Sequence, residues 1–256
     1  MTLLQQHILA LSVTAATSIG LGLLVFLSDQ KRAVNRVFFI YVLSIAWWAA
    51  SECFEISAST IDEVGPWNIS KFMGVCFIAP TFLHTVMLVT IDLRKRTHVI
   101  LGLGYVGGAS FIALRLFTNL LTGEPRPVAY TNYYTPLTVF GAYLPISFLM
   151  LVSLGLLKLW RATKTALGQR KTQLKYLLWG SLIGYAGGSF DWTLPFGFHV
   201  PFLNPFGIYA VPLYSLALTY AVLQHRLFDF NLVIRKSLVY SILVTLLTVG
   251  YFGLVY

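Results

Sequence analysis

Four charged residues of this chain lie inside long apolar stretches, where a charged side chain is costly to bury. They are Glu52, Glu55, Arg115 and Asp191, and each lies near one end of its stretch. An ionisable group at the centre of a bilayer costs roughly 3 kcal/mol by insertion scales, so such a group usually faces the protein interior and marks a functional site. We therefore interpret these four as candidate ligand-binding residues.

Aromatic and histidine side chains follow the last of these residues along the chain. Trp192 and His199 lie in the connection 187–205, which also holds three prolines. Polar groups that converge inside aromatic walls are typical of a small-molecule pocket, so we add both residues to the candidate site. A second interpretation stays open, in which Arg115 pairs with one carboxylate, the other acidic groups reach the membrane surface and the aromatic residues form an interfacial belt.

The sequence lacks the common signatures of catalysis and of metal binding. It contains no H-E-x-x-H, P-loop or G-x-S-x-G motif, so we predict no enzymatic activity within these residues. His84 has no second His or Cys at ligand spacing, which predicts a packing role for it, no metal site and no cofactor. Cys53 and Cys76 are interpreted as buried thiols, the commoner state, although a disulfide between neighbouring spans is geometrically conceivable.

The composition is that of an integral membrane protein. Hydrophobic residues make up 57% of the 256 residues and charged residues only 11%, and the mean hydropathy is +0.75. This is far more apolar than a water-soluble surface permits. The net charge of +9 does not indicate nucleic-acid binding, because Lys and Arg form short clusters between the apolar stretches.

Eight apolar stretches are long enough to cross a bilayer as helices, since a helical span needs about 20 residues. We predict an all-α fold, a polytopic transmembrane bundle with seven spans in residues 1–223. A cytoplasmic amphipathic junction at 224–237 and an additional apolar helix at 238–256 follow it. The predicted spans are approximately 7–27, 37–57, 69–91, 99–118, 137–160, 176–196, 204–223 and 238–256.

The basic residues predict the orientation of the bundle. Fifteen of the 18 Lys and Arg residues follow the first, third, fifth and seventh spans. Because basic loops stay in the cytoplasm, the N-terminus is predicted to lie outside. The longest basic segment, residues 158–175, is predicted to be a loop that fixes the topology and meets lipid headgroups.

Small residues predict close contacts between helices. Gly180, Gly184 and Gly188 form one stripe of the sixth span, and Gly104 and Gly108 recur at the same spacing in the fourth. Such stripes let helix backbones approach closely in lipid. In the connection after the sixth span, prolines prevent a continuous helix and phenylalanines predict a cap that folds back onto the bundle.

A junction of mixed character follows the seventh span. Residues 220–241 read YAVLQHRLFDFNLVIRKSLVYS, in which both signs of charge separate two apolar runs. The longer string PFGIYAVPLYSLALTYAVLQHRLFDFNLVIRKSLVYS, together with FIAPTFLHTVML in the third span, resembles the seven-transmembrane N-terminal sensor domain of bacterial histidine kinases and related diguanylate cyclases. The strongest part of the resemblance is the RLFD element, formed by residues Arg226, Leu227, Phe228 and Asp229.

The resemblance covers about residues 7–237 and implies a receptor in a bacterial cytoplasmic membrane. It implies a soluble signalling region after the junction, and it names no ligand. Our hypothesis is that the RLFD element passes a signal to a cytoplasmic signalling domain or partner protein, and a passive connector between two helices stays open as the alternative. The lipid bilayer is the first partner, and a homodimer or a membrane complex is a further hypothesis. The alternatives are a non-catalytic subunit of a larger membrane complex and a small-solute transporter.

Overall fold

The computed structural model describes residues 2–92, 94–198, 200, 204 and 206–225. The RLFD element, the predicted helix 238–256 and His199 lie outside the described residues. Within them, the chain forms seven α-helices, two short strands and two 3₁₀-helices. The elements are α1 (Leu3–Ser28), α2 (Ala33–Ser57), α3 (Ile61–Thr90), α4 (Lys95–Phe117), β1 (Arg126–Val128), β2 (Thr131–Tyr134), α5 (Tyr143–Thr165), α6 (Gly168–Gly188), η1 (Ser189–Phe196), η2 (Phe206–Tyr209) and α7 (Ala210–His225).

The predicted all-α membrane bundle is confirmed. Among the described residues, the five helices α1 to α5 are each long and apolar enough to cross a bilayer. α6 is less apolar because its first half carries Arg170, Lys171 and Lys175, and α7 is described over 16 residues. Each of the seven helices overlaps one of the first seven predicted spans.

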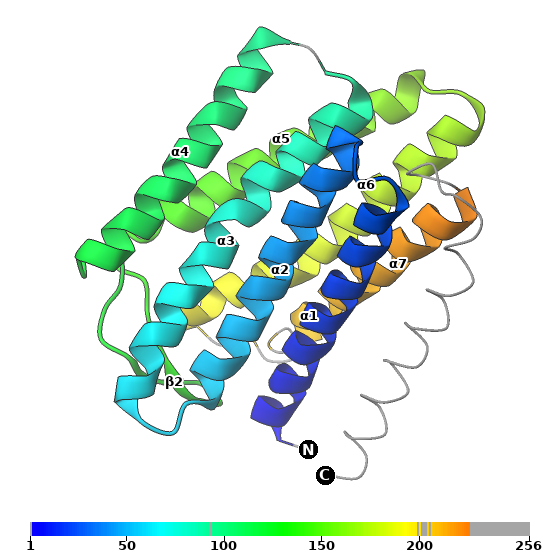
Figure 1. Cartoon of the computed structure of the whole chain (residues 1–256). Coiled ribbons are helices and arrows are strands. Elements are labelled where there is room, and N and C mark those ends of the chain that lie inside the picture. The colour runs from blue at the N-terminus through cyan, green and yellow to red at the C-terminus, as the bar shows by residue number, and fades with distance from the viewer. Residues whose placement is uncertain (1, 93, 199, 201–203, 205, 226–256) are drawn as a thin grey trace.

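Six helices enclose the interior, and α4 lies outside them (Figure 1). α1 contacts α2, α2 contacts α3, α3 contacts α5, α5 contacts α6, α6 contacts α7, and α7 returns to α1. The N-terminus, the α2–α3 turn and the β1–β2 hairpin lie at one end of the bundle. We call this the outer end, following the orientation that the basic residues predict.

Several boundaries differ from the prediction; the sixth predicted span, 176–196, for example, ends as an α-helix at Gly188 and continues as η1. α3 begins at Ile61, ahead of the predicted start at residue 69. The predicted loop at 158–175 is wrong, because α5 continues to Thr165 and α6 begins at Gly168. Gly168 has a φ of 53°, a left-handed conformation that suits glycine, and it closes a tight turn. Long basic side chains at helix ends extend to the headgroups, so their charge does not require a loop.

The outer connections fold back onto the bundle. In the β1–β2 hairpin, which the sequence did not predict, Arg126 is opposite Tyr134 and Val128 is opposite Thr131. In η1, Leu194 is fully buried, and the carbonyl of Pro195 accepts a hydrogen bond from a backbone N–H of the α4–α5 connection at 2.9 Å. The predicted cap is therefore confirmed for its described part.

The predicted close contacts at glycine are also confirmed. A Cβ at Gly184 would lie 2.8 Å from the Cβ of Tyr214 on α7, and a Cβ at Gly108 would lie 2.8 Å from the carbonyl oxygen of Cys76 on α3. A larger residue at either position would force the two helices apart. Cys76 is a buried free thiol, as expected, whereas Cys53 is a free thiol that is only partly buried.

At the opposite end, Asp92 joins the α3–α4 turn to α5. Its carboxylate accepts hydrogen bonds from Lys158 Nζ, from Thr97 Oγ1 at 3.2 Å and from the backbone N–H of Arg94 at 3.0 Å. Burial alone would raise the pKa of Asp92, but these donors outweigh it and hold the pKa below its usual range. The carboxylate therefore stays ionised as part of the structure.

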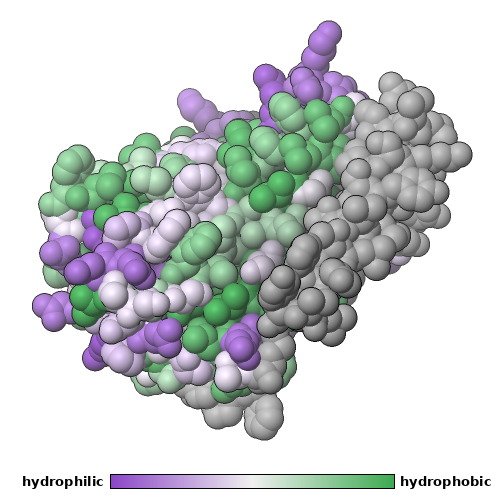
Figure 2. Space-filling model, turned by 60° about the horizontal axis from the view of Figure 1, so that its bottom comes forward, coloured by the Kyte–Doolittle hydropathy of each residue, from purple (hydrophilic) through white to green (hydrophobic). Residues whose placement is uncertain are grey.

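Apolar side chains cover the outside of the helices. On α4, Val99, Leu103 and Val106 are 55%, 66% and 64% exposed. Figure 2 shows hydrophobic surface on the body of the molecule, with hydrophilic residues gathered toward its edges. So large an apolar surface fits contact with lipid rather than with water.

Candidate functional site

Six ionisable side chains form a buried layer near the outer end of the bundle. A charge is costly to bury unless it is paired or hydrogen-bonded, so the partners of each group indicate its role. We call this group the charged layer. Its members, each no more than 9% exposed, are His7 on α1, Glu52 and Glu55 on α2, Lys71 on α3, Arg115 on α4 and Asp191 on η1.

In one half of the charged layer, Glu55 has a partner at each oxygen. Lys71 Nζ lies 2.6 Å from Oε2. The side-chain amide of Asn68 and the backbone N–H of Thr135 both donate to Oε1 at 3.1 Å. Arg115 Nε donates to Asn68 Oδ1 at 2.8 Å, so Asn68 connects the guanidinium to the carboxylate. This half joins α2, α3, α4 and the segment after β2.

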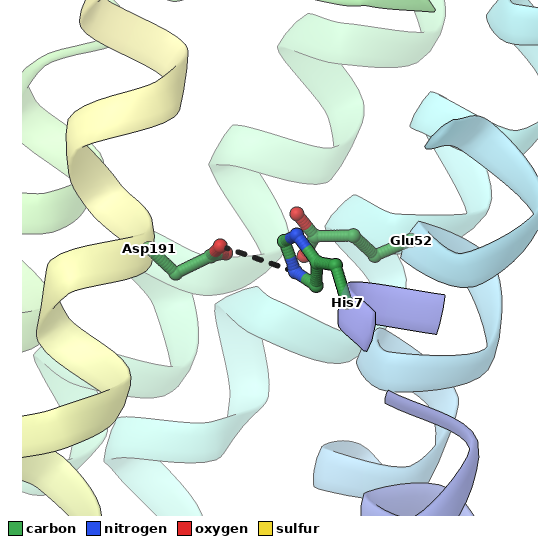
Figure 3. A group of neighbouring side chains, drawn as sticks. All are labelled: His7, Glu52 and Asp191. Atoms are coloured by element: carbon green, nitrogen blue, oxygen red, sulfur yellow. Dashed lines mark ion pairs between the residues drawn. The ribbon is translucent and has the colours of Figure 1, made fainter. Parts of the chain in front are cut away.

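The other half brings together His7, Glu52 and Asp191, whose side chains point toward one another (Figure 3). One potential ligand atom from each lies within 4.8 Å of the other two. His7 Nε2 is 3.6 Å from Asp191 Oδ1. Among the described residues, His7 Nε2, Asp191 Oδ1 and Glu52 Oε2 have no hydrogen-bond partner. Each of these three buried side chains thus has one polar atom without a hydrogen bond, and two of these atoms, His7 Nε2 and Asp191 Oδ1, face each other.

The hairpin positions both halves. Tyr130, in its turn, forms a 2.9 Å hydrogen bond through its hydroxyl with Nδ1 of His7. Tyr134, at the end of β2, donates to Glu52 Oε1 at 2.9 Å. Lys71 Nζ lies 4.2 Å from the centre of the Tyr134 ring, in a cation–π contact. Tyr134 therefore connects the paired half to the unpaired half.

A pocket begins at the charged layer and extends toward the middle of the bundle. Glu52, Lys71 and Asp191 lie in its polar wall, whereas most of its other walls are apolar or aromatic. Trp192 and Phe148 line it in an edge-to-face contact, with ring centres 5.5 Å apart. Its empty space is about 840 Å³, counted with the part that is open to solvent. A few polar groups in an apolar wall are the usual composition of a small-molecule site.

Three tyrosines from three helices meet in the deeper part of this pocket. The Tyr41 hydroxyl on α2 lies 3.0 Å from that of Tyr185 on α6 and donates to that of Tyr214 on α7 at 3.1 Å. All three line the pocket. Tyr214 also packs against Gly184, at one of the close contacts between α6 and α7. A molecule in the pocket would therefore contact side chains of both α6 and α7 where these helices pack together.

The family model for the N-terminal 7TM region of histidine kinase matches residues 10–231. The chain belongs to this family. It is a membrane sensory module and a multi-pass membrane protein, which confirms the resemblance seen in the sequence. The match includes the RLFD element and all of the described helices except the first residues of α1. No curated protein matches the chain.

The residues predicted from sequence divide into three groups in this 7TM region. Glu52, Asp191 and Trp192 line the pocket. Glu55 and Arg115 lie in the paired half of the charged layer, and they are connected through Asn68 instead of touching. His199 and the RLFD element lie outside the described residues, so their roles stay predictions.

Sequence reasoning missed other members of the site. Asn68 and Lys71 are three residues apart on α3 and so share one face, a signal that was available at the start of the third predicted span. His7 was missed as a member of the charged layer because no His or Cys lies at a short spacing from it along the chain. A mixed group with Glu52 and Asp191 appears only when α1, α2 and η1 come together.

Proposed function

We propose that this 7TM region senses a small amphipathic molecule. Its polar end would lie at Glu52 and Asp191, and its apolar part would lie among the aromatic walls, with Trp192 packed against it. The observation that carries the proposal is the pocket, which joins unpartnered oxygens at one end to the tyrosines of α6 and α7 at the other. Glu55 and Arg115 support the site by holding α2, α3 and α4 in place.

The coupling would pass through α7. A ligand beside Tyr185 and Tyr214 favours one packing of α7 on α6, and Gly184 permits a close contact that is sensitive to small displacements. A ligand shifts such an equilibrium only by its differential affinity for the two arrangements, so these must differ by no more than a few kcal/mol. The chain continues from α7 into the RLFD element, which we propose as the coupling junction.

The cellular setting is the remaining part of the proposal. A region from histidine kinases, with most basic residues at one end, fits the bacterial cytoplasmic membrane with its N-terminus outside. The signal would pass to a cytoplasmic signalling domain or partner protein, in a homodimer or a membrane complex. Cysteines introduced at Glu124 and Lys164 should react with an impermeant maleimide from opposite sides. Reaction from the same side would contradict the orientation.

Photolabelling tests the pocket directly. A small aliphatic alcohol that carries a diazirine should label Tyr185 and Trp192 saturably in protein reconstituted in nanodiscs, as mapped by mass spectrometry. Ile45→Trp should abolish this labelling, because Ile45 is buried in the pocket wall and indole would fill the space. Leu43→Trp is the matched control, since Leu43 lies on the same helix and is 40% exposed. Equal labelling in both variants, or labelling of lipid-facing residues alone, would contradict the proposed ligand pocket.

Substitution of the RLFD element tests the coupling. Phe228→Ala and Asp229→Ala should leave abundance and pocket labelling unchanged, and should alter the signalling output of the full-length protein or its complex. Unchanged output in both variants would reduce the junction to a tether between helices.

A further inference from the structure

We propose that His7, Glu52 and Asp191 bind a divalent transition-metal ion, with Zn²⁺ as the representative. The proposal stands on the unpaired half of the charged layer and does not depend on the organic ligand proposed for the pocket. Its basis is a group of three close potential metal ligands from three different elements, each with one buried polar atom that has no hydrogen-bond partner.

The geometry suits a small ion. Zinc bonds to imidazole nitrogen and carboxylate oxygen are about 2.1 Å long, so two ligands of a zinc tetrahedron lie about 3.4 Å apart. His7 Nε2 and Asp191 Oδ1 are 3.6 Å apart, and the whole group fits within 4.8 Å. Small side-chain adjustments would bring all three atoms to bonding distance. A fourth position would be left for water or for a molecule in the pocket.

Burial makes the missing partners significant. His7 and Glu52 are fully buried and Asp191 is 7% exposed. A buried polar atom without a hydrogen bond has lost its contacts with water without gaining others, which destabilises the folded protein. Two carboxylates at such close range also repel each other when both are ionised. One divalent cation removes both penalties, because it accepts all three lone pairs and neutralises the two charges.

The second layer of contacts matches that of a metal site. Metal-bound histidines usually hydrogen-bond through their other ring nitrogen, which fixes the tautomer and the ring orientation. Tyr130 occupies this position at Nδ1 of His7, so that Nε2 faces the carboxylates. Tyr134 likewise holds the other oxygen of Glu52. The mixture of one imidazole and two carboxylates favours Zn²⁺ and related transition ions over Mg²⁺ or Ca²⁺, which prefer oxygen ligands.

The test is a zinc titration of the full chain in nanodiscs, purified with a tag that contains no histidine and dialysed against a chelator. Calorimetry should show one saturable Zn²⁺ per chain. His7→Gln and Asp191→Asn should each weaken the affinity at least about 10-fold, and Tyr130→Phe about 10-fold through the second layer. His84→Gln is the matched control, because His84 is also held by a tyrosine hydroxyl, at 3.0 Å from Tyr105, but is not in the group.

X-ray absorption at the zinc edge identifies the zinc ligands in the wild-type protein, so this test does not depend on whether a variant folds. The wild-type spectrum should show a nitrogen and oxygen shell with imidazole scattering. Failure to bind, a spectrum without imidazole, or equal affinity in all variants would overturn the proposal, and failure to bind would favour a proton shared by the two carboxylates. Ile45→Trp should keep its zinc affinity, so the metal site and the ligand pocket can fail separately.

Discussion

Glu52 and Glu55 are the same residue type, three positions apart on one face of α2, and both are fully buried. Their surroundings are nonetheless opposite. Glu55 is paired with Lys71 and accepts two further hydrogen bonds, whereas Glu52 faces Asp191 and keeps one oxygen without a partner. Burial of a charge therefore does not indicate function in itself. The paired carboxylate holds helices together, and the other is the one that we propose for ligand binding.

The largest effect is expected at Lys71. Lys71→Ala leaves Glu55 buried without its counter-ion, which typically costs about 3–5 kcal/mol. Thermal or SDS-induced unfolding in a lipid environment would measure the loss. The control is Arg32→Ala, since Arg32 lies 3.7 Å from Asp29 in a pair whose side chains are 45% and 40% exposed, and such pairs contribute less than about 1 kcal/mol. Similar losses of stability in the two variants would contradict the conclusion that the Lys71–Glu55 pair contributes more than the exposed Arg32–Asp29 pair.

The sharpest comparison uses one substitution at two neighbouring positions. Glu55→Gln removes the charge that balances Lys71 and should cost about 3 kcal/mol. Glu52→Gln removes a charge that faces another carboxylate, and its amide oxygen can still accept from Tyr134, so the change should stay within about 1 kcal/mol in metal-free protein. Unfolding of both variants in the same chelator-treated buffer gives the comparison. A larger loss at Glu52 would reverse the assignment of the two halves.

A smaller loss is expected at Arg115, because its recorded hydrogen bond goes to Asn68 and reaches Glu55 only indirectly. Arg115→Ala should cost about 1.5–3 kcal/mol, the usual contribution of a hydrogen bond to a charged group. Arg115→Lys keeps the charge and tests whether the guanidinium geometry matters. A loss as large as that of Lys71→Ala would show that Arg115 is the main counter-ion of Glu55.

The smallest effect is expected at the opposite end of the bundle. Because the pKa of Asp92 is lowered in the folded protein, its contribution to stability is complete above the usual carboxyl pKa of about 3.9 and is lost as the pH falls through the lower folded value. Unfolding midpoints measured down through this window should fall less steeply for Asp92→Asn than for the wild type. Parallel curves would mean that Lys158 does not stabilise the ionised form.

Hydropathy was sufficient to predict the helices, because every span must satisfy its backbone hydrogen bonds internally and so appears as a continuous apolar run. The residue types in the connecting segments were not sufficient to predict where the helices end or where the hairpin forms. The segment 158–175 looked like a loop because of its charge, yet basic side chains extend from helix ends without breaking them. The hairpin was missed because strands of three and four residues leave almost no periodic signal.

Site residues were predictable where one charged side chain lies in an apolar span, because the free-energy cost of burying that charge marks the residue by itself. Glu52, Glu55, Arg115 and Asp191 are conspicuous because each is charged within an apolar run. Which carboxylate has a counter-ion depends on α3 and on the hairpin, and no spacing along the chain contains that information. His7 lies at the very start of the first predicted span, where a histidine is unremarkable until η1 brings Asp191 to it.

Because the helices are synthesised in order, the two halves of the charged layer form at different times during synthesis. Glu55 and Lys71 belong to consecutive helices, so their ion pair can form as soon as the α2–α3 pair has entered the bilayer. Asp191 follows α6 along the chain, so it is synthesised long after His7 and Glu52. The ion pair between Glu55 and Lys71 can therefore stabilise the growing bundle early in synthesis. Asp191 can join Glu52 only after η1 has been synthesised, so the proposed binding site is completed late in assembly.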